Sequence, residues 1–289
     1  MSRDRAKELV ALFKNFTGTY LLAEVEEALI IREEITPLLI GLLEEVAADP
    51  DEYVEFGRFG HEYAVVLLAH FQEPAAHLPI IRAFSLPPET LNLLWGDMIT
   101  ENLPAFLCRT ACGNYDAIKG LVLNRDAEEY VRTAAMESLL LAVASGDLTR
   151  DEVIAFHGAL FDESLARPDE NFWPGLVNNL LDLYPGELIG QIRDLYAKGR
   201  VQEWDISTAQ IDEVMTEGLD ATLAKLPQNL ARRVPEDIHS YISWFACFKE
   251  NDQLTKSDAP PPRKALNNLK TKARNKRKQG KAAKRKNRK

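Results

Sequence analysis

The sequence predicts an all-α protein in which antiparallel helix pairs stack on one another. Apolar residues recur at spacings of three and four along most of the chain, which is the period of one helix face. Short turns rich in glycine, proline and aspartate separate these segments. The sequence lacks the period-two alternation that is typical of a half-buried strand. Together these observations favour a stack of helices over a fold that contains a sheet.

The first half of the chain predicts a series of helices. Residues 20–31 form an expected apolar and acidic helix. Thr36-Pro37 favours the start of the next helix, with threonine as the N-cap and proline at the first helical position, and Asp49-Pro50 favours its end. Further helices are predicted at 62–71, 78–84, 103–111 and 115–123. Because short turns join them, consecutive helices are expected to fold back on one another.

The clearest predicted helix covers 128–145. Its apolar and small residues recur on one face, and Gly146 favours a stop directly after it. We therefore expect this face to lie in the core. The residues of the face are Val131, Ala134, Ala135, Ser138, Leu139, Ala142 and Val143.

Two capping boxes mark helix starts in the second half. Thr149 is followed three residues later by Glu152, and Ser207 is followed three residues later by Gln210. Between these boxes, 171–183 and 187–197 predict a helical hairpin. The helix pairs are spaced by roughly 40 residues, which is the period of helix-pair repeats.

One segment is similar to the second helix of a HEAT repeat. It comprises Leu121-Val122, residues 126–132, and then Ala135 and Leu139. A small residue such as Ala135 allows a neighbouring helix to cross closely. The resemblance implies an α–α superhelix, a HEAT/ARM-like solenoid of antiparallel helix pairs.

Residues 20–226 also resemble a bacterial family of unassigned function, domain-of-unknown-function family 1186, built from such helix pairs. The resemblance is carried, in this order, by Arg32-Glu33-Glu34, residues 95–100, Val131-Arg132, Leu188-Ile189 and residues 194–199. Members of that family often end in a cysteine-rich, zinc-binding SEC-C module. This chain has no cysteine after Cys247, so the module and its zinc are absent, and a basic tail stands in their place.

Three regions are expected along the chain: an N-terminal segment at 1–19, a HEAT-like helical domain at 20–250, and a disordered Lys/Arg-rich tail at 251–289. Ala259 and three prolines after it form a stiff hinge. Leu266 and Leu269 are the only large apolar residues beyond the hinge, so the tail has too little apolar surface to fold alone.

Charge divides the chain into two parts of opposite sign. Residues 256–289 hold fifteen lysines and arginines and one acid, a net charge of +14, whereas residues 1–255 carry a net charge of −23. A cationic tail on an acidic body indicates polyanionic partners. The tail has no aromatic residue to stack on bases, so sequence-specific recognition is not expected.

The tail therefore predicts non-specific contact with RNA or the ribosome, through phosphate neutralisation by lysine and arginine. A purely solubilising tail is the alternative, and in a eukaryotic source the same clusters would indicate nuclear import. The nucleic-acid-binding residues expected in the dense clusters are Lys272, Arg274, Lys276, Arg277, Lys278, Lys284, Arg285, Lys286, Arg288 and Lys289.

Histidines give no complete catalytic or metal motif. His61-Glu62 begins like a metalloprotease motif, but position 65 is Val65 rather than a second histidine. His70 and His77 are separated by a proline, so we expect ordinary turn or surface histidines. No phosphate loop, nucleophile elbow or Ser/His/Asp arrangement is recognisable, so no catalytic residue, metal or cofactor is predicted.

Three cysteines, Cys108, Cys112 and Cys247, are too few for a disulfide framework and favour a reducing compartment. Cys108 and Cys112 are four residues apart on a predicted helix and form half a metal site at most, so we favour core residues. The N-terminus lacks the apolar core of a secretory signal, and no run is long enough to span a bilayer. A cytoplasmic protein without membrane contact is expected.

Two further patches have more than one interpretation. Between Glu24 and Glu73 there are thirteen acids and two bases, which favour a solvated face but also suit cation binding, acid–base chemistry or docking of a basic partner. Near the C-terminal end of the body, apolar and aromatic residues crowd one short predicted helix. Closure of the end of the stack is preferred over an exposed aromatic patch. These residues are Ile238, Tyr241, Ile242, Trp244, Phe245 and Phe248.

The sequence thus predicts a non-enzymatic scaffold, with a helical body that binds an unidentified protein partner and a tail that contacts RNA, the ribosome or another polyanion. The alternative is an uncharacterised enzyme or metal-binding protein that uses the acidic N-terminal half. A third hypothesis is an intramolecular contact in which the tail rests on the acidic body until a polyanion competes.

Overall fold

The computed structural model describes residues 2–15, 18–56, 58–166, 171–234, 237–243, 245 and 248. Within these ranges the chain forms helices joined by turns, and no strand occurs. The prediction of an all-α protein is therefore confirmed. Contacts between Cα atoms divide the chain into one unit at Met1–Phe248 and another at Lys249–Lys289.

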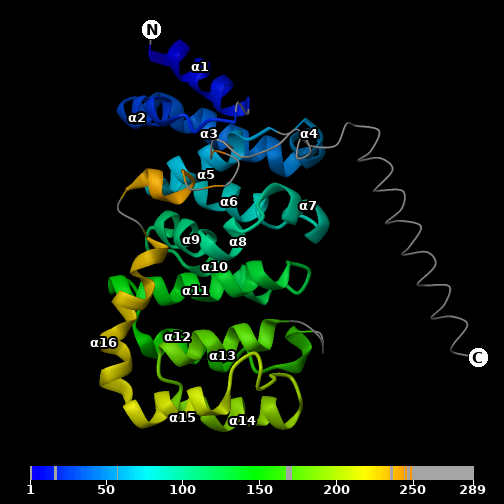
Figure 1. The fold of residues 1–289 in the computed structure, drawn as a ribbon, viewed down its shortest axis with the longest axis vertical. Coiled ribbons are helices and arrows are strands. Elements are labelled where there is room, and N and C mark those ends of the chain that lie inside the picture. The colour runs from blue at the N-terminus through cyan, green and yellow to red at the C-terminus, as the bar shows by residue number, and fades with distance from the viewer. Residues whose placement is uncertain are drawn as a thin grey trace, which may run out of the picture. The chain divides into compact units, whose positions relative to one another are not determined.

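The helices of the first unit lie in successive layers (Figure 1). The layers follow the order of the chain from α1 to α15, which is compatible with the expected helical-repeat arrangement. The first layers contain α1 (Ser2–Lys14), α2 (Leu22–Ile30), α3 (Arg32–Ala48), α4 (Pro50–Phe56), α5 (Gly60–His70), η1 (Pro74–Ala76), α6 (His77–Ala83), α7 (Pro88–Leu94), α8 (Met98–Glu101) and α9 (Leu103–Ala111). The later layers contain α10 (Asp116–Leu123), α11 (Glu129–Ser145), α12 (Arg150–Gly158), η2 (Glu163–Leu165), α13 (Phe172–Asp182), η3 (Gly186–Leu188), α14 (Ile189–Ala197) and α15 (Thr208–Glu217).

The core is continuous along these layers, with α5 and α11 near its centre. α5 packs against α1, α3 and α9, and α11 packs against α9, α10 and α13. The face predicted for α11 is buried from Val131 to Ala142, and Val143 is partly buried. Gly175 lets α13 approach α11 closely, because a Cβ there would lie 2.5 Å from the Thr133 hydroxyl oxygen.

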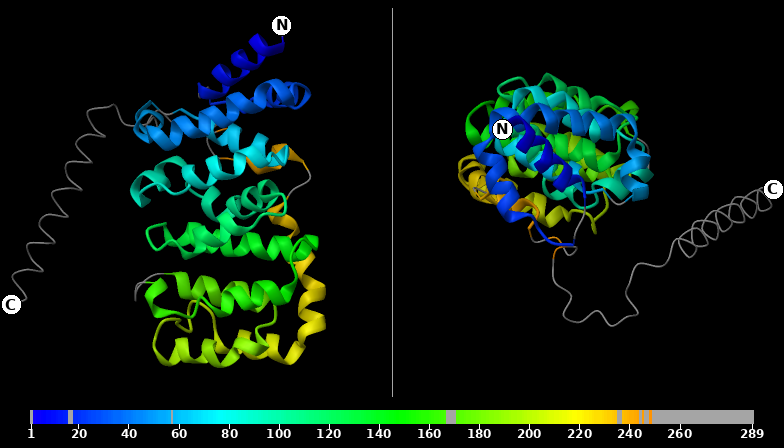
Figure 2. Two further views of the ribbon diagram at one scale, coloured as in Figure 1. Left: turned by 180° about the vertical axis from the view of Figure 1, so that it is seen from behind. Right: turned by 90° about the horizontal axis from the view of Figure 1, so that it is seen from above.

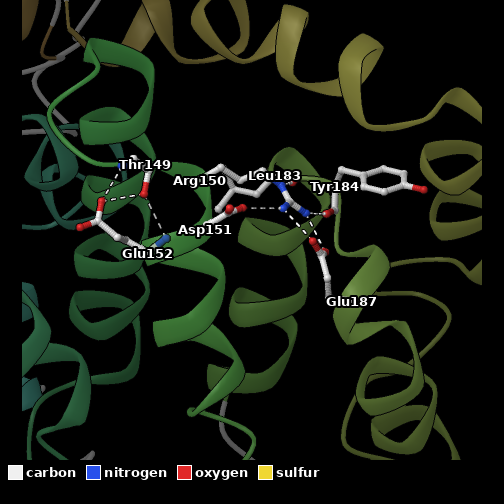
Figure 3. Close-up of polar contacts among 7 residues, drawn as sticks. All are labelled: Thr149, Arg150, Asp151, Glu152, Leu183, Tyr184 and Glu187. Atoms are coloured by element: carbon white, nitrogen blue, oxygen red, sulfur yellow. Dashed lines mark hydrogen bonds and ion pairs between the residues drawn. The ribbon is translucent and has the colours of Figure 1, made fainter.

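Helix ends follow the capping rules where the sequence signal is strong. The Thr149–Glu152 and Ser207–Gln210 boxes both form, and Gly146 ends α11 with φ of 83°. Figure 3 shows the Thr149 box beside Arg150, which reaches from the start of α12 to the next layer.

Arg150 links α12 to the end of α13. Its Nε donates to the carbonyl oxygen of Leu183 at 2.7 Å, and its Nη2 donates to the carbonyl oxygen of Tyr184 and to Oε2 of Glu187 (Figure 3). Because the last carbonyls of a helix lack intrahelical donors, this guanidinium satisfies groups that would otherwise need water.

The helix start expected at Thr36-Pro37 is wrong. α3 already begins at Arg32, and the Thr36 hydroxyl donates back to the Arg32 carbonyl oxygen at 2.8 Å, as an interior residue does. Ile35 and Leu39, on either side of Pro37, are both fully buried. Burial of this face therefore carries the helix through the proline, against its local preference.

The C-terminal part of the body turns back across the layers. α16 (Leu219–Leu230) and η4 (Ala231–Arg233) run past α13 and α11, and η5 (Ile238–Tyr241) reaches α5 (Figures 1 and 2). We call residues 219–234 the strap. The aromatic segment after it covers apolar surface rather than forming an exposed patch. Ile238, Tyr241 and Ile242 are buried, and Phe248 packs on Tyr20 and Phe59 in the first layers. Trp244 lies outside the described residues.

Candidate interaction site

The strap is held on the stack by a long-range polar contact at Arg233. Its Nε donates to Oε1 of Glu137 in α11 at 2.7 Å. Its Nη1 donates to the carbonyl oxygen of Thr100 at 2.9 Å and to Oε2 of Glu101 at 3.1 Å, both in α8. Burial raises the pKa of Glu137, although the charge of Arg233 opposes this. The arginine therefore compensates a carboxylate that the stack partly buries.

A second polar contact and two buried leucines also hold the strap on the stack. Asn229 donates to Oδ1 of Asp182 in α13 at 3.2 Å, and burial raises the pKa of that carboxyl. Leu226 and Leu230 of α16 are buried. The stack thus binds the strap as a basic amphipathic segment, with apolar side chains below and cations beside half-buried acids.

A cavity of about 520 Å³ opens where the strap passes the ends of α9 and α11. The stack contributes Cys108 of α9, Leu141 and Ala144 of α11, and the residues that follow these helices. One wall belongs to the strap and consists of Pro227, Leu230, Ala231 and Val234. The size falls in the range of small-molecule pockets and also suits one or two side chains of a partner.

Polar groups meet at the edge of the cavity around Asp147. The hydroxyl groups of Tyr115 and Ser145 donate to the same carboxylate oxygen, Oδ2, at 3.1 Å and 2.8 Å. Burial raises the pKa of Tyr115, so its hydroxyl stays protonated and donates. Burial, together with the nearby Asp147 charge, also raises the pKa of the Cys108 thiol to about 12. The Cys108 sulfur in this cavity is a neutral thiol.

Arg109 lines the same cavity, but its guanidinium donates hydrogen bonds to the C-terminal end of α5. Nε donates to the carbonyl oxygen of Ala69 at 2.8 Å, and Nη2 donates to that of His70 at 3.1 Å. Both carbonyls belong to the C-terminal end of α5, which carries partial negative charge. The positive charge is thus already engaged by the helix end.

A family model described as a protein of unknown function (DUF1186) matches residues 5–249. The chain belongs to this family. The resemblance drawn from the sequence is confirmed.

Two curated relatives of this DUF1186 protein come from chlamydiae. An uncharacterized protein of Chlamydia trachomatis serovar D is 29% identical over 225 residues, which cover 76% of this chain and 89% of the relative. An uncharacterized protein of Chlamydia muridarum is 29% identical over 204 residues, covering 70% and 82%. No solved structure matches this chain.

The cysteines of the DUF1186 body differ from the expected core residues. Cys108 is half-buried at the cavity, whereas Cys112 is exposed and ends α9 in the left-handed region with φ of 47°. The core interpretation is therefore wrong for Cys112, because the helix ends one residue before it. Its Sγ donates weakly to the carbonyl oxygen of Gln72, 3.6 Å away. Cys247 lies outside the described residues.

The histidines are mostly structural. His61 is buried in α5, 2.9 Å from the carbonyl oxygen of Leu94, and burial lowers its pKa to about 4. His77, expected to be an ordinary turn or surface histidine, follows the short 3-10 turn at Pro74 and begins α6. It is buried rather than at the surface, because the turn leads directly into the core, and its Nδ1 lies 2.9 Å from the Thr110 hydroxyl oxygen.

The acidic residues near the N-terminus lie partly in ion pairs. Arg5 pairs with Glu27 at 2.7 Å, and Lys14 pairs with Glu45 at 2.6 Å. Among the described side chains, no group of three or more histidines, cysteines, aspartates or glutamates is placed to hold a metal ion. Nor do the helices in the described ranges include one long and apolar enough to cross a membrane.

The nucleic-acid-binding residues predicted in the tail lie outside the described residues, so that prediction remains a prediction. Sequence reasoning missed the cavity and the strap. The apolar residues Leu219, Leu223, Leu226 and Leu230 are spaced for a helix and indicate one. Their spacing does not indicate that the helix turns back across earlier layers.

Proposed function

We propose that this DUF1186 protein is a non-enzymatic interaction scaffold of the cytoplasm. Its helical body binds a protein partner, and its basic tail contacts RNA, the ribosome or another polyanion. The observation that supports the body's part is the cavity between the strap and the stack, which combines an apolar wall with an oriented carboxylate. The tail's part is supported by its net charge of +14 against −23 for residues 1–255.

RNA binding by the tail is tested by salt titration of the full chain. If about six tail cations contact single-stranded phosphates, log affinity falls against log salt with a slope near −4, at roughly 0.7 per contact. A variant that ends at Asp258 keeps the whole first unit and should lose RNA binding, because the remaining chain is acidic. RNA affinity that is unchanged in this variant would contradict the proposed role of the tail.

The intramolecular hypothesis has its own comparison. If the acidic body competes for the tail, a peptide of residues 259–289 binds RNA more tightly than the full chain at low salt, and the difference narrows as salt screens the body. Equal affinities at low salt would remove this contact and leave a free tether. Absence of RNA binding by both would leave only a solubilising tail.

A further inference from the structure

We infer that the cavity between the strap and the ends of α9 and α11 receives a basic segment of the partner protein. One apolar side chain of that segment fills the cavity, and a neighbouring ammonium or guanidinium group pairs with Asp147. This inference rests on the proposed scaffold function and names the chemistry of its partner.

The apolar part of the site is already built. Leu141 and Leu230 are buried side chains that line the cavity, and Ala144 and Ala231 leave space between them. The volume of about 520 Å³ exceeds what one leucine or phenylalanine side chain needs, so a peptide side chain enters without repacking.

Asp147 supplies the charged part. Tyr115 and Ser145 both donate to Oδ2, which fixes the orientation of the carboxylate, while no described residue donates to Oδ1. An oriented acceptor at the edge of an apolar cavity favours a charge-assisted hydrogen bond from a cation. Arg109 also lines the cavity, but its guanidinium donates to the Ala69 and His70 carbonyls and not to Asp147, so the Asp147 carboxylate stays available to a cation of the partner.

The strap provides a precedent in the same molecule. Beside the cavity, the stack already holds a segment in which a buried leucine, Leu230, is followed by Arg233 on Glu137. The cavity lies beside this contact, with Leu141 in its wall and Asp147 at its edge. The net charge of −23 on residues 1–255 also attracts a basic segment.

Disulfide exchange at Cys112 tests directly, in the full chain, whether the cavity prefers a cationic group. Cys112 is exposed and lines the cavity, whereas the raised pKa of Cys108 makes that thiol a poor nucleophile. The probes are three small disulfides that share a phenethyl body and end in an amine, a methyl group or a carboxylate. Labelling is measured by peptide mass mapping at equilibrium in excess reductant.

We expect the amine probe to label Cys112 about five-fold more than the carboxylate probe, the ratio for an exposed charge pair of roughly 1 kcal/mol. Asp147→Asn, which keeps an oxygen acceptor for Tyr115 and Ser145, should remove most of this ratio. Glu213→Gln is the matched control, because it removes the same charge from α15, outside the cavity, and should leave the ratio unchanged. Equal ratios in wild type and Asp147→Asn, or a preference for the carboxylate, would overturn the inference.

A second variant tests the apolar half and keeps the charge. Ala144→Phe fills the cavity and should reduce labelling by the amine and methyl probes alike, and unchanged labelling would overturn the inference. Helical circular dichroism and melting temperature identify a variant that has not folded.

An affinity capture separates this inference from the proposed scaffold function. A protein partner that binds wild type and Asp147→Asn equally leaves the scaffold function standing and contradicts this inference. Conversely, Asp147-dependent labelling without any captured protein contradicts the scaffold function and leaves the cavity's preference intact.

Discussion

The helices α11 and α15 occupy the centre and the end of the same stack. α11 has 17 residues, of which ten are buried, and helices of several layers surround it. α15 has 10 residues, and Ile211 is its one buried residue in the described structure. Since apolar burial is the main favourable term in folding, the centre of the stack carries far more of its stability than the end.

Polar contacts compensate for this deficit toward the end. Arg150 links α12 to the end of α13, and Glu163 pairs with Lys198 at 2.8 Å and with Arg200 at 3.3 Å around α14. The centre and the end of one helical stack thus depend on different forces, so substitutions in the two regions should differ in size and kind.

The largest effect is expected at Val131, which is fully buried in α11. Val131→Asp places an unpaired charge in the core and should lower the free energy of unfolding by on the order of 3 kcal/mol or more. Ala209→Asp introduces the same acid at an exposed site in the first turn of α15. This substitution should change the free energy of unfolding by less than about 0.5 kcal/mol. Chemical denaturation measures both. A wild-type melting temperature for Val131→Asp would contradict the packing of α11.

The next effect is expected at Arg150. Arg150→Met keeps the apolar stem but leaves the Leu183 and Tyr184 carbonyls without this donor, at a cost of about 1.5–3 kcal/mol. Hydrogen exchange should increase in 183–197 and stay unchanged in α5. Arg150→Lys is the matched variant, which keeps the charge but loses the forked geometry. Uniform exchange changes across all layers would contradict a local contact.

The pH dependence of stability should differ between α5 and α12. Burial raises the pKa of Glu62 in α5 to about 9, above its ordinary value of 4.5. The folded protein therefore keeps a proton that the unfolded chain releases, so this group costs stability increasingly as pH rises from 4.5 toward 9. Glu62→Gln should raise the melting temperature more at pH 8 than at pH 5. An equal gain at both pH values would contradict the buried carboxyl.

His157 in α12 should lower the stability of the fold at acidic pH. Burial lowers its pKa to about 3, and neither ring nitrogen has a hydrogen-bond partner among the described residues. Stability from this group is complete above the ordinary pKa of 6.5 and is lost as pH falls toward 3. The difference in melting temperature between His157→Phe and wild type should therefore shift in favour of His157→Phe as pH falls from 7 to 4.5. A constant difference over that interval would mean that His157 does not titrate in unfolding.

The smallest effect is expected for the cysteines. The double variant Cys108→Ser with Cys112→Ser should lower the free energy of unfolding by about 1 kcal/mol or less, because one thiol is half-buried and the other exposed. Metal content, measured by elemental analysis, should stay at background in wild type and variant. Stoichiometric zinc in wild type that disappears in the double variant would revive the metal-binding alternative.

Much of the fold was predictable because local signals and packing agree. The helix at 103–111 matches α9, and both capping boxes form where the sequence places them. The prediction failed at Pro37, where burial of Ile35 and Leu39 outweighs a local start signal. Local propensity is therefore a guide only where tertiary packing does not oppose it.

The candidate site was much less predictable. Asp147 meets Tyr115 across 32 residues, and Arg233 meets Glu137 across 96 residues. Such contacts depend on the path of the strap, which no local period or turn signal encodes. Cys112 is expected in the core, but it follows the last residue of α9 in the left-handed region, which leaves its thiol exposed at the cavity.

The central claim is that the body and the tail bind different kinds of partner. Affinity capture with the full chain tests it most directly, with and without nuclease, in wild type, in Asp147→Asn, and in a variant with the ten predicted tail cations changed to glutamine. The account predicts that RNA capture is lost only in the tail variant, and that nuclease-resistant protein capture is reduced only in Asp147→Asn. Loss of all captured protein from the wild type on nuclease treatment, or loss of both activities with the tail alone, would contradict it.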